Sequence, residues 1–153
     1  SFKGYPIKLL TIHLSGGSSM IKSALVSSKG IDAKCIGVSI LTSINEEESK
    51  EIYNQEIPKT VSSMFNLANE TDIDGVVCSP HELKLAGNLL QDKIKITPGI
   101  RLSDSNSDDQ SRVMNPIEAI DLGATYLVIG RPITSHKDKA SAFEKIYQSI
   151  YEK

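Results

Sequence analysis

Five short apolar runs recur along the chain, and each is followed by a loop and then by apolar residues at helical spacing. Most runs are continuously apolar rather than alternating, which is typical of parallel strands that are covered on both faces. The predicted strands span residues 9–14, 35–41, 75–78, 94–97 and 126–130.

The spacing of apolar residues predicts helices in the connections between these strands. The first runs from Ser18 to Ser28, with Gly30 just past its end. Glu46-Glu47-Glu48 is interpreted as the solvated N-terminus of another helix. The last helix covers about Lys139 to Tyr151. Proline is tolerated in a first helical turn, where its missing N–H has no helical partner, and three further helices are expected to open at Pro58, Pro80 and Pro116.

A β-strand followed by a helix, five times over, predicts an α/β fold with a parallel sheet and right-handed crossovers. Two architectures fit this order, an open doubly wound sheet and part of a (β/α)8 barrel. A complete barrel needs eight units and typically about 250 residues, whereas this chain has 153. Residues 1–153 are therefore expected to form one domain that is either an open sheet or a partial (β/α) barrel completed by other residues.

Composition narrows the class of protein. Hydrophobic residues make up 39% and charged residues 24%, as expected for a packed globular core. The formal net charge of -2 gives no broad electrostatic reason to expect nucleic acid or an anionic membrane as partner. No apolar run approaches the roughly 20 residues of a membrane span and no signal peptide is recognised, so a cytoplasmic location is expected. Cys35 and Cys78 have apolar neighbours and are expected to be buried structural thiols.

Candidate chemistry gathers after the last two predicted strands. The segment Thr97-Pro98-Gly99-Ile100-Arg101 leads into a polar loop that contains Asp108-Asp109-Gln110. Gly130 and Arg131 follow the fifth strand. In barrels, loops in this position commonly hold a phosphate. Gly130 would let the backbone approach an anion closely, and Arg131 carries a planar, permanently charged fork suited to phosphate oxygens.

Other candidate residues have simpler interpretations. His13 ends an apolar strand and is expected to be a hydrogen-bonded core residue rather than a catalytic base. His81 and His136 stand in surface contexts without companion ligands, so no metal site is predicted. The turn at residues 16–19 could bind an anion, but a strand-to-helix turn with a capped helix start is favoured.

Six segments, in order along essentially the whole chain, resemble the signature of bacterial orotidine 5'-monophosphate decarboxylases. The resemblance implies a (β/α)8 barrel acting as a homodimer, of which this chain matches the fourth through eighth units. The matching segments are His13-Leu14-Ser15-Gly16-Gly17, Val38-Ser39-Ile40-Leu41-Thr42-Ser43, Asp74-Gly75-Val76-Val77-Cys78-Ser79, Thr97-Pro98-Gly99-Ile100-Arg101, Asp109-Gln110 and Val128-Ile129-Gly130-Arg131-Pro132-Ile133-Thr134.

The resemblance implies a role for residues on the phosphate side of the site. Arg131 and the N–H of Gly130 are expected to hold the 5'-phosphate. Arg101 is expected beside the phosphate or beside the loop that closes over it. Gln110 is expected to bridge the phosphate side and the pyrimidine.

The resemblance also implies a pyrimidine side. Ser79 is expected to hydrogen-bond the amide edge of the base, and Thr42 to end its strand at the pocket. Leu41 and Pro98 are expected to form apolar walls.

The family removes the C6 carboxylate of its nucleotide without a metal or an organic cofactor. The resemblance implies carbanion stabilisation followed by proton donation from a lysine within an Asp-Lys-Asp-Asp network. In the family these groups come from the first three strands and from a loop of the partner subunit, around an Asp-Leu-Lys-x-x-Asp-Ile-Pro segment. This sequence lacks that segment, and Lys3 and Lys8 do not match it. Because the developing carbanion needs a local cation and a proton, no catalytic residue is assigned here, and the chain alone is expected to be inactive without an N-terminal barrel segment.

Two alternatives remain open. A related phosphate-binding barrel enzyme, such as hexulose-phosphate synthase or a ribulose-phosphate epimerase, would share the fold but is expected to lack the combined Pro-Gly-Ile-Arg, Asp-Gln and Gly-Arg-Pro set. A non-catalytic nucleotide-phosphate-binding fragment would bind uridine monophosphate without turnover, even with the missing segment supplied.

Overall fold

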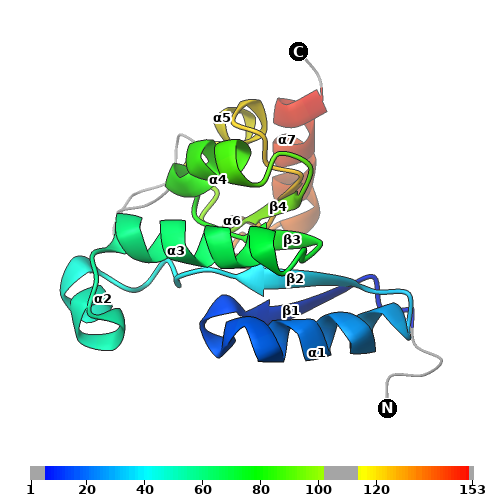
Figure 1. Cartoon of the computed structure of the whole chain (residues 1–153). Coiled ribbons are helices and arrows are strands. Elements are labelled where there is room, and N and C mark those ends of the chain that lie inside the picture. The colour runs from blue at the N-terminus through cyan, green and yellow to red at the C-terminus, as the bar shows by residue number, and fades with distance from the viewer. Residues whose placement is uncertain (1–5, 102–113, 152–153) are drawn as a thin grey trace.

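A single parallel sheet organises the computed structural model, which describes residues 6–101 and 114–151 (Figure 1). Its strands are ordered β1-β2-β3-β4-β5, so each strand pairs with its neighbour in sequence. Their bounds are β1 (Leu9–His13), β2 (Lys34–Val38), β3 (Gly75–Val77), β4 (Ile94–Thr97) and β5 (Tyr126–Leu127). All five predicted strands are present, although β1 and β3 end one residue, and β2 and β5 three residues, before their predicted ends.

Helices fill the connections, as the spacing of apolar residues predicts. The bounds are α1 (Gly17–Lys29), α2 (Glu46–Tyr53), α3 (Ile57–Glu70), α4 (Leu83–Leu89), α5 (Pro116–Asp121), α6 (Arg131–Thr134) and α7 (Lys139–Tyr151), with 3-10 turns η1 (Leu14–Gly16) and η2 (Pro80–Glu82). The short α6 was not predicted. Within the described ranges, no helix combines the length and the apolar character needed to cross a bilayer.

The starts of the helices differ in how they are capped. Asn45 accepts hydrogen bonds from the backbone N–H groups of Glu47 and Glu48, and the Glu48 carboxylate accepts one from the backbone of Asn45. This capping box confirms the predicted helix start at Glu46. The turn before α1 is a strand-to-helix turn as predicted, but Gly16 at its N-cap makes no side-chain capping bond, because glycine has no side chain to accept one.

The core lies where the helices meet one face of the sheet. Phe65 of α3, Leu83 of α4 and Ile21 of α1 are fully buried there, together with Cys35 and Val76 from the strands. Burial of a side chain of this size stabilises a fold by about 1.5–3 kcal/mol. Both cysteines are free and buried, as predicted.

The opposite face of the sheet is exposed at its two edges. Leu10 pairs with Cys35, which faces the helices, so Leu9 and His13 belong to the other face. Leu9 is 39% exposed at one edge, and Tyr126 of β5 is 51% exposed at the other. The expectation that His13 is a core residue was wrong, because its side chain is exposed on an edge strand.

Three helix-to-strand turns share one geometry at the amino ends of the strands. Asp32, Asp72 and Gly123 each adopt a positive φ, of 55°, 55° and 95°. The following residue of each turn donates its backbone N–H to a carbonyl in the last turn of the preceding helix. Gly30, expected to end α1, has an ordinary φ of -65°, and Asp32 supplies the left-handed residue instead.

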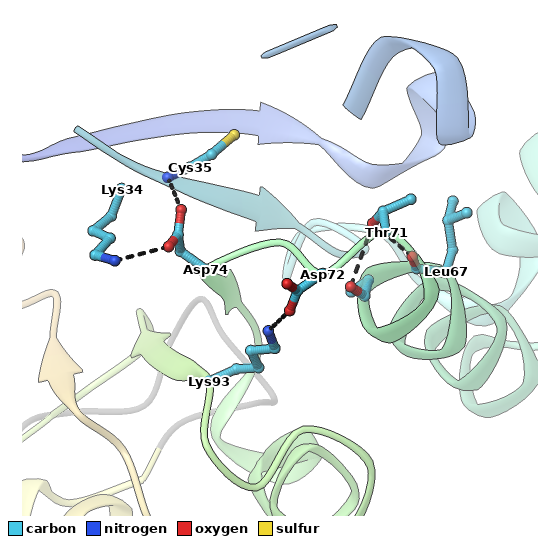
Figure 2. Close-up of polar contacts among 8 residues, drawn as sticks. Lys34, Cys35, Leu67, Thr71, Asp72, Asp74 and Lys93 are labelled. Atoms are coloured by element: carbon cyan, nitrogen blue, oxygen red, sulfur yellow. Dashed lines mark hydrogen bonds and ion pairs between the residues drawn. The ribbon is translucent and has the colours of Figure 1, made fainter. Parts of the chain in front are cut away.

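Two ion pairs join the elements at this same end of the sheet (Figure 2). Asp74 accepts from the backbone N–H of Cys35 at 2.9 Å and from Lys34 Nζ at 3.0 Å, which ties β2 to β3. Lys93 pairs with Asp72. The hydrogen bond that Lys93 donates to Asp72 lowers the pKa of Asp72, and the one that Lys34 donates to Asp74 raises the pKa of Lys34. In barrels the amino ends of strands serve stability, so we assign these pairs to the fold.

Candidate functional site

The carboxyl ends of the five strands meet at one edge of the sheet, because all the strands are parallel. Thr42 and Ser79 follow β2 and β3. Pro98 follows β4 directly, and Gly130 follows β5. The topology therefore brings the predicted site residues of the described ranges to one end of the sheet. Gln110, with Asp108 and Asp109, lies outside the described residues.

Backbone hydrogen bonds hold the ends of β4 and β5 side by side. Val128 donates its N–H to the carbonyl oxygen of Thr97 at 2.9 Å. Past β4, Arg101 donates its N–H to the carbonyl of Met114 at 3.1 Å, and Met114 donates to that of Gly99 at 3.3 Å. The two loops predicted to hold a phosphate thus start from neighbouring points.

Gly130 and Arg131 form the turn that opens α6. The carbonyl oxygen of Gly130 accepts from the N–H groups of Ile133 at 2.9 Å and Thr134 at 3.0 Å. A Cβ placed on Gly130 would meet no atom within 4 Å, and Arg131 is exposed. Open space beside the Gly130 backbone is what close approach of an anion requires.

Arg101 has a different orientation from the one expected of a phosphate ligand. Its side chain is half-buried, and Nη1 donates to the carbonyl oxygen of Ile100 at 3.0 Å. The guanidinium is therefore turned onto its own backbone. The remaining N–H groups of the guanidinium can still donate to a ligand, since a guanidinium has five N–H groups.

Ser79, the predicted pyrimidine ligand, is 1% exposed. Its Oγ accepts from the N–H of His81 at 3.4 Å, and its own N–H donates to Glu82 Oε2 at 3.0 Å. A hydroxyl with this burial contacts a ligand only when the groups that cover it move. Leu41 is 46% exposed, and Thr42 and Pro98 are half-buried, so these three face accessible space more readily.

Glu82 is a residue of this region that the sequence analysis did not single out. Its side chain is buried, and Oε2 also accepts from Ser39 Oγ at 3.3 Å. The signal was present in the sequence, because Ser79-Pro80-His81-Glu82 has the spacing of a capping box. Burial raises the pKa of the nearby Cys78 thiol to about 12, and the Glu82 charge adds to the rise.

Lys34, Lys93 and Lys95 contact partners within the fold, away from this edge of the sheet. Lys34 and Lys93 form the ion pairs at the opposite end of the sheet. Lys95 is buried and donates to the carbonyls of Gln91 and Lys93 at 3.0 and 3.1 Å.

Among residues 6–101 and 114–151, no three histidine, cysteine or acidic side chains are grouped as a metal site would need. His81 and His136 are exposed, as predicted.

Comparison with known proteins gives the family. The sequence profile of the Orotidine 5'-phosphate decarboxylase / HUMPS family matches residues 3–146. The chain belongs to this family. Orotidine 5'-phosphate decarboxylase of Staphylococcus saprophyticus is 40% identical over 148 residues, covering 94% of this chain and 64% of that protein. The enzyme of Ehrlichia chaffeensis is 44% identical over 147 residues, covering 94% and 63%.

Solved structures of the family share the fold. The crystal structure of orotidine 5'-phosphate decarboxylase from Lactobacillus acidophilus matches with a TM-score of 0.76 and 33% identity, over 95% of this chain and 64% of that one. The enzyme from Sulfolobus solfataricus, 16% identical, matches in fold with a TM-score of 0.68. The five-stranded unit is therefore part of a (β/α)8 barrel. The chain spans a little under two thirds of these relatives.

Proposed function

We propose that this chain supplies the phosphate- and pyrimidine-binding part of an orotidine 5'-monophosphate decarboxylase, which forms uridine 5'-monophosphate (UMP) in cytoplasmic de novo pyrimidine biosynthesis. The proposal rests on family membership together with one observation. The loop after β4 and the Gly130 turn after β5 start side by side, with open space beside Gly130. The residues proposed to bind substrate are Thr42, Ser79, Pro98, Arg101, Gln110, Gly130 and Arg131.

The phosphate side is the better supported half of this site. The space where a Cβ of Gly130 would lie is free of other atoms within 4 Å, and the exposed Arg131 follows Gly130 directly. An arginine donates two parallel hydrogen bonds to phosphate oxygens. On the pyrimidine side, Ser79 must first become accessible, so we expect binding of the base to be accompanied by a local rearrangement.

The chemical step requires groups that we do not assign to this chain. In decarboxylation the bond between C6 and the carboxylate carbon breaks, CO2 leaves, and the electron pair remains on C6 until a proton arrives. A nearby cation must stabilise that carbanion and a proton donor must complete the reaction. Lys34, Lys93 and Lys95 are held in contacts of the fold. Because this sequence lacks the family's Asp-Leu-Lys-x-x-Asp-Ile-Pro segment, we propose that the chain alone is inactive. The reaction of the assembled enzyme is proposed to use no metal or organic cofactor.

A further barrel segment is the proposed partner that supplies those groups. Five βα units cannot close an eight-unit barrel, and we propose that residues 1–153 correspond to units four to eight. The side chains exposed at both sheet edges, Leu9 and Tyr126 among them, would be covered by the remaining strands. The Phe143, Tyr147 and Tyr151 rings stack along an exposed side of α7 and offer a surface for a helix of that segment. The completed barrel is proposed to act as a homodimer.

The relatives favour this function over the alternatives. The family description includes the HUMPS branch, in which a related sugar-phosphate lyase would fall. The relatives compared above are orotidine 5'-phosphate decarboxylases. A non-catalytic fragment that binds nucleotide phosphate would bind UMP as our proposal expects. It would show no turnover even after an N-terminal barrel segment is added, whereas our proposal expects turnover.

Titration calorimetry of the chain with UMP, ribose 5-phosphate and uridine tests the binding half of the proposal. We expect UMP to bind more tightly than ribose 5-phosphate and uridine to bind most weakly, since uridine lacks the phosphate. Equal affinity for UMP and uridine would show that the phosphate contributes nothing to binding and would contradict the proposed phosphate site. Absence of heat with every ligand, from a sample that unfolds cooperatively, would remove the proposed function.

A further inference from the structure

Glu82 is a buried carboxylate at the edge of the sheet that carries the proposed site. It is 8% exposed and lies in the turn between β3 and α4. Burial of an ionised carboxylate costs several kcal/mol unless hydrogen bonds replace its water. A side chain used only to cap a helix would not need this burial.

The contacts of Glu82 join two strand ends. One oxygen, Oε2, accepts from the N–H of Ser79, the second residue after β3, at 3.0 Å. The same oxygen accepts from the hydroxyl of Ser39, the first residue after β2, at 3.3 Å. Ser39 also donates its own N–H to the carbonyl of Val77 at 3.1 Å. The Glu82 carboxylate therefore links the Ser79 backbone to the end of β2, beside the backbone bond from Ser39 to Val77.

Glu48 provides an internal comparison. It forms the same reciprocal capping box with Asn45 at the start of α2, where the backbone N–H of Asn45 donates to Glu48 Oε2 at 2.9 Å. Glu48 is exposed, and its hydrogen bond with Asn45 stays within the start of α2. A glutamate can therefore complete a capping box while it is exposed and without contacting a strand end. Glu82 differs from Glu48 because it is buried and also contacts the end of β2.

We propose that Glu82 is a positioning residue for the pyrimidine side of the site. It holds the backbone of Ser79 at the end of β3, so that the local rearrangement that exposes the Ser79 hydroxyl presents it to the amide edge of the base. It thereby selects a nucleotide over a bare sugar phosphate. This inference rests on the proposed function of Ser79, and it assigns Glu82 no contact with the substrate.

The test compares four variants, Glu82→Ala, Glu82→Gln, Ser79→Ala and the double variant Glu82→Ala with Ser79→Ala, by titration with UMP and with ribose 5-phosphate. Glu82→Ala is expected to weaken UMP binding about threefold to tenfold, the value of the one uncharged hydrogen bond from Ser79 to the base, and to leave ribose 5-phosphate binding unchanged. Glu82→Gln, which keeps the shape but not the charge, should restore part of the loss. In the Ser79→Ala background the Glu82 effect should vanish. Equal loss for both ligands, or full additivity of the two substitutions, would overturn the proposal.

A ligand-free measurement separates this inference from the proposed function. Glu82→Ala should speed amide hydrogen exchange at Ser79 relative to Cys78, whose N–H bonds to the carbonyl of Ile96 at 3.0 Å. Glu48→Ala should not. Ser39→Ala, which leaves the carboxylate in place, should give a smaller increase in exchange at Ser79. This variant replaces Glu82→Ala in the test if Glu82→Ala does not fold. Unchanged exchange at Ser79 would overturn the positioning role. If the wild-type chain binds no UMP but amide exchange at Ser79 becomes faster in Glu82→Ala, the proposed function is contradicted. The structural part of this inference, that Glu82 holds the Ser79 backbone, is then still supported.

Discussion

Val128 donates its backbone N–H to the carbonyl oxygen of Thr97 at 2.9 Å, just where β4 and β5 end. This bond sets the loop of Pro98 and Arg101 beside the turn of Gly130 and Arg131. Neither loop alone would make a convincing anion site. Together they give two backbone segments and two guanidinium groups from consecutive βα units, the arrangement in which barrels commonly hold phosphate.

The first prediction concerns the Arg131 guanidinium. Arg131→Ala should weaken UMP binding by about 1.5–3 kcal/mol, the usual value of a hydrogen bond to a charged group. Calorimetry measures the change directly. Lys145→Ala removes an exposed cation from α7 and should leave the affinity as it was. An unchanged affinity for Arg131→Ala would remove this residue from the site.

The second prediction concerns the backbone of Gly130. A Cβ there meets no protein atom within 4 Å, so Gly130→Ala should leave the folded structure intact. The methyl group would nevertheless stand in the space through which a phosphate approaches, and UMP affinity should fall about tenfold or more. Gly87→Ala, also free of neighbours within 4 Å, is the matched control. Undiminished UMP binding to Gly130→Ala would show that the anion does not approach this backbone.

The third prediction separates fold from site at the other end of the sheet. Gly123 has a φ of 95°, which disfavours any side chain, so Gly123→Ala should destabilise the chain by about 1–2 kcal/mol. Gly87 lies inside α4, and Gly87→Ala should raise helix stability by up to about 1 kcal/mol. Urea unfolding followed by circular dichroism measures both. A lower free energy of unfolding for Gly123→Ala and a higher one for Gly87→Ala would support the positive φ at Gly123. An unchanged free energy of unfolding for Gly123→Ala would contradict it.

The fourth prediction concerns the two thiols. Burial raises the pKa of Cys78 to about 12 and also raises that of Cys35. Because the thiolate is the reactive form, neither cysteine should react with an aromatic disulfide reagent at pH 8 unless urea is added. The folded Cys78 thiol holds its proton above its ordinary pKa of 9.0, so its contribution to stability is full below pH 9 and is lost as the pH rises towards 12. Rapid labelling of native protein would show that the thiols are accessible.

Much of the fold follows from local pattern, and the departures have physical causes. Continuous apolar runs mark β1 to β5 because both faces of a parallel strand are usually covered. His13 was misjudged because it lies on β1, an edge strand of the described sheet, and a local pattern does not report which strands lie at an edge. Gly30 was expected to end α1, yet the left-handed residue is Asp32, a residue type that also tolerates this conformation.

The candidate site was predictable in place but not in detail. The strand order and the spacing of the motifs indicated which residues follow the carboxyl ends of the strands. The parallel sheet places the described ones at that edge. The sequence did not indicate that Ser79 is buried or that Arg101 turns onto the carbonyl of Ile100. Both depend on how loops pack against one another. The role of Glu82 needed the sheet register, since its partners Ser39 and Ser79 are 40 positions apart in sequence.

The central claim is that this chain is the binding part of an orotidine 5'-monophosphate decarboxylase. The most direct test mixes it with a polypeptide that carries the first third of the Staphylococcus saprophyticus relative, and follows the loss of orotidine 5'-monophosphate absorbance. We expect no turnover from either part alone, turnover from the mixture, and its loss with Arg131→Ala. A stable mixture that binds UMP but never turns over would contradict the enzymatic claim, and turnover by this chain alone would contradict the assignment of catalysis to the missing segment.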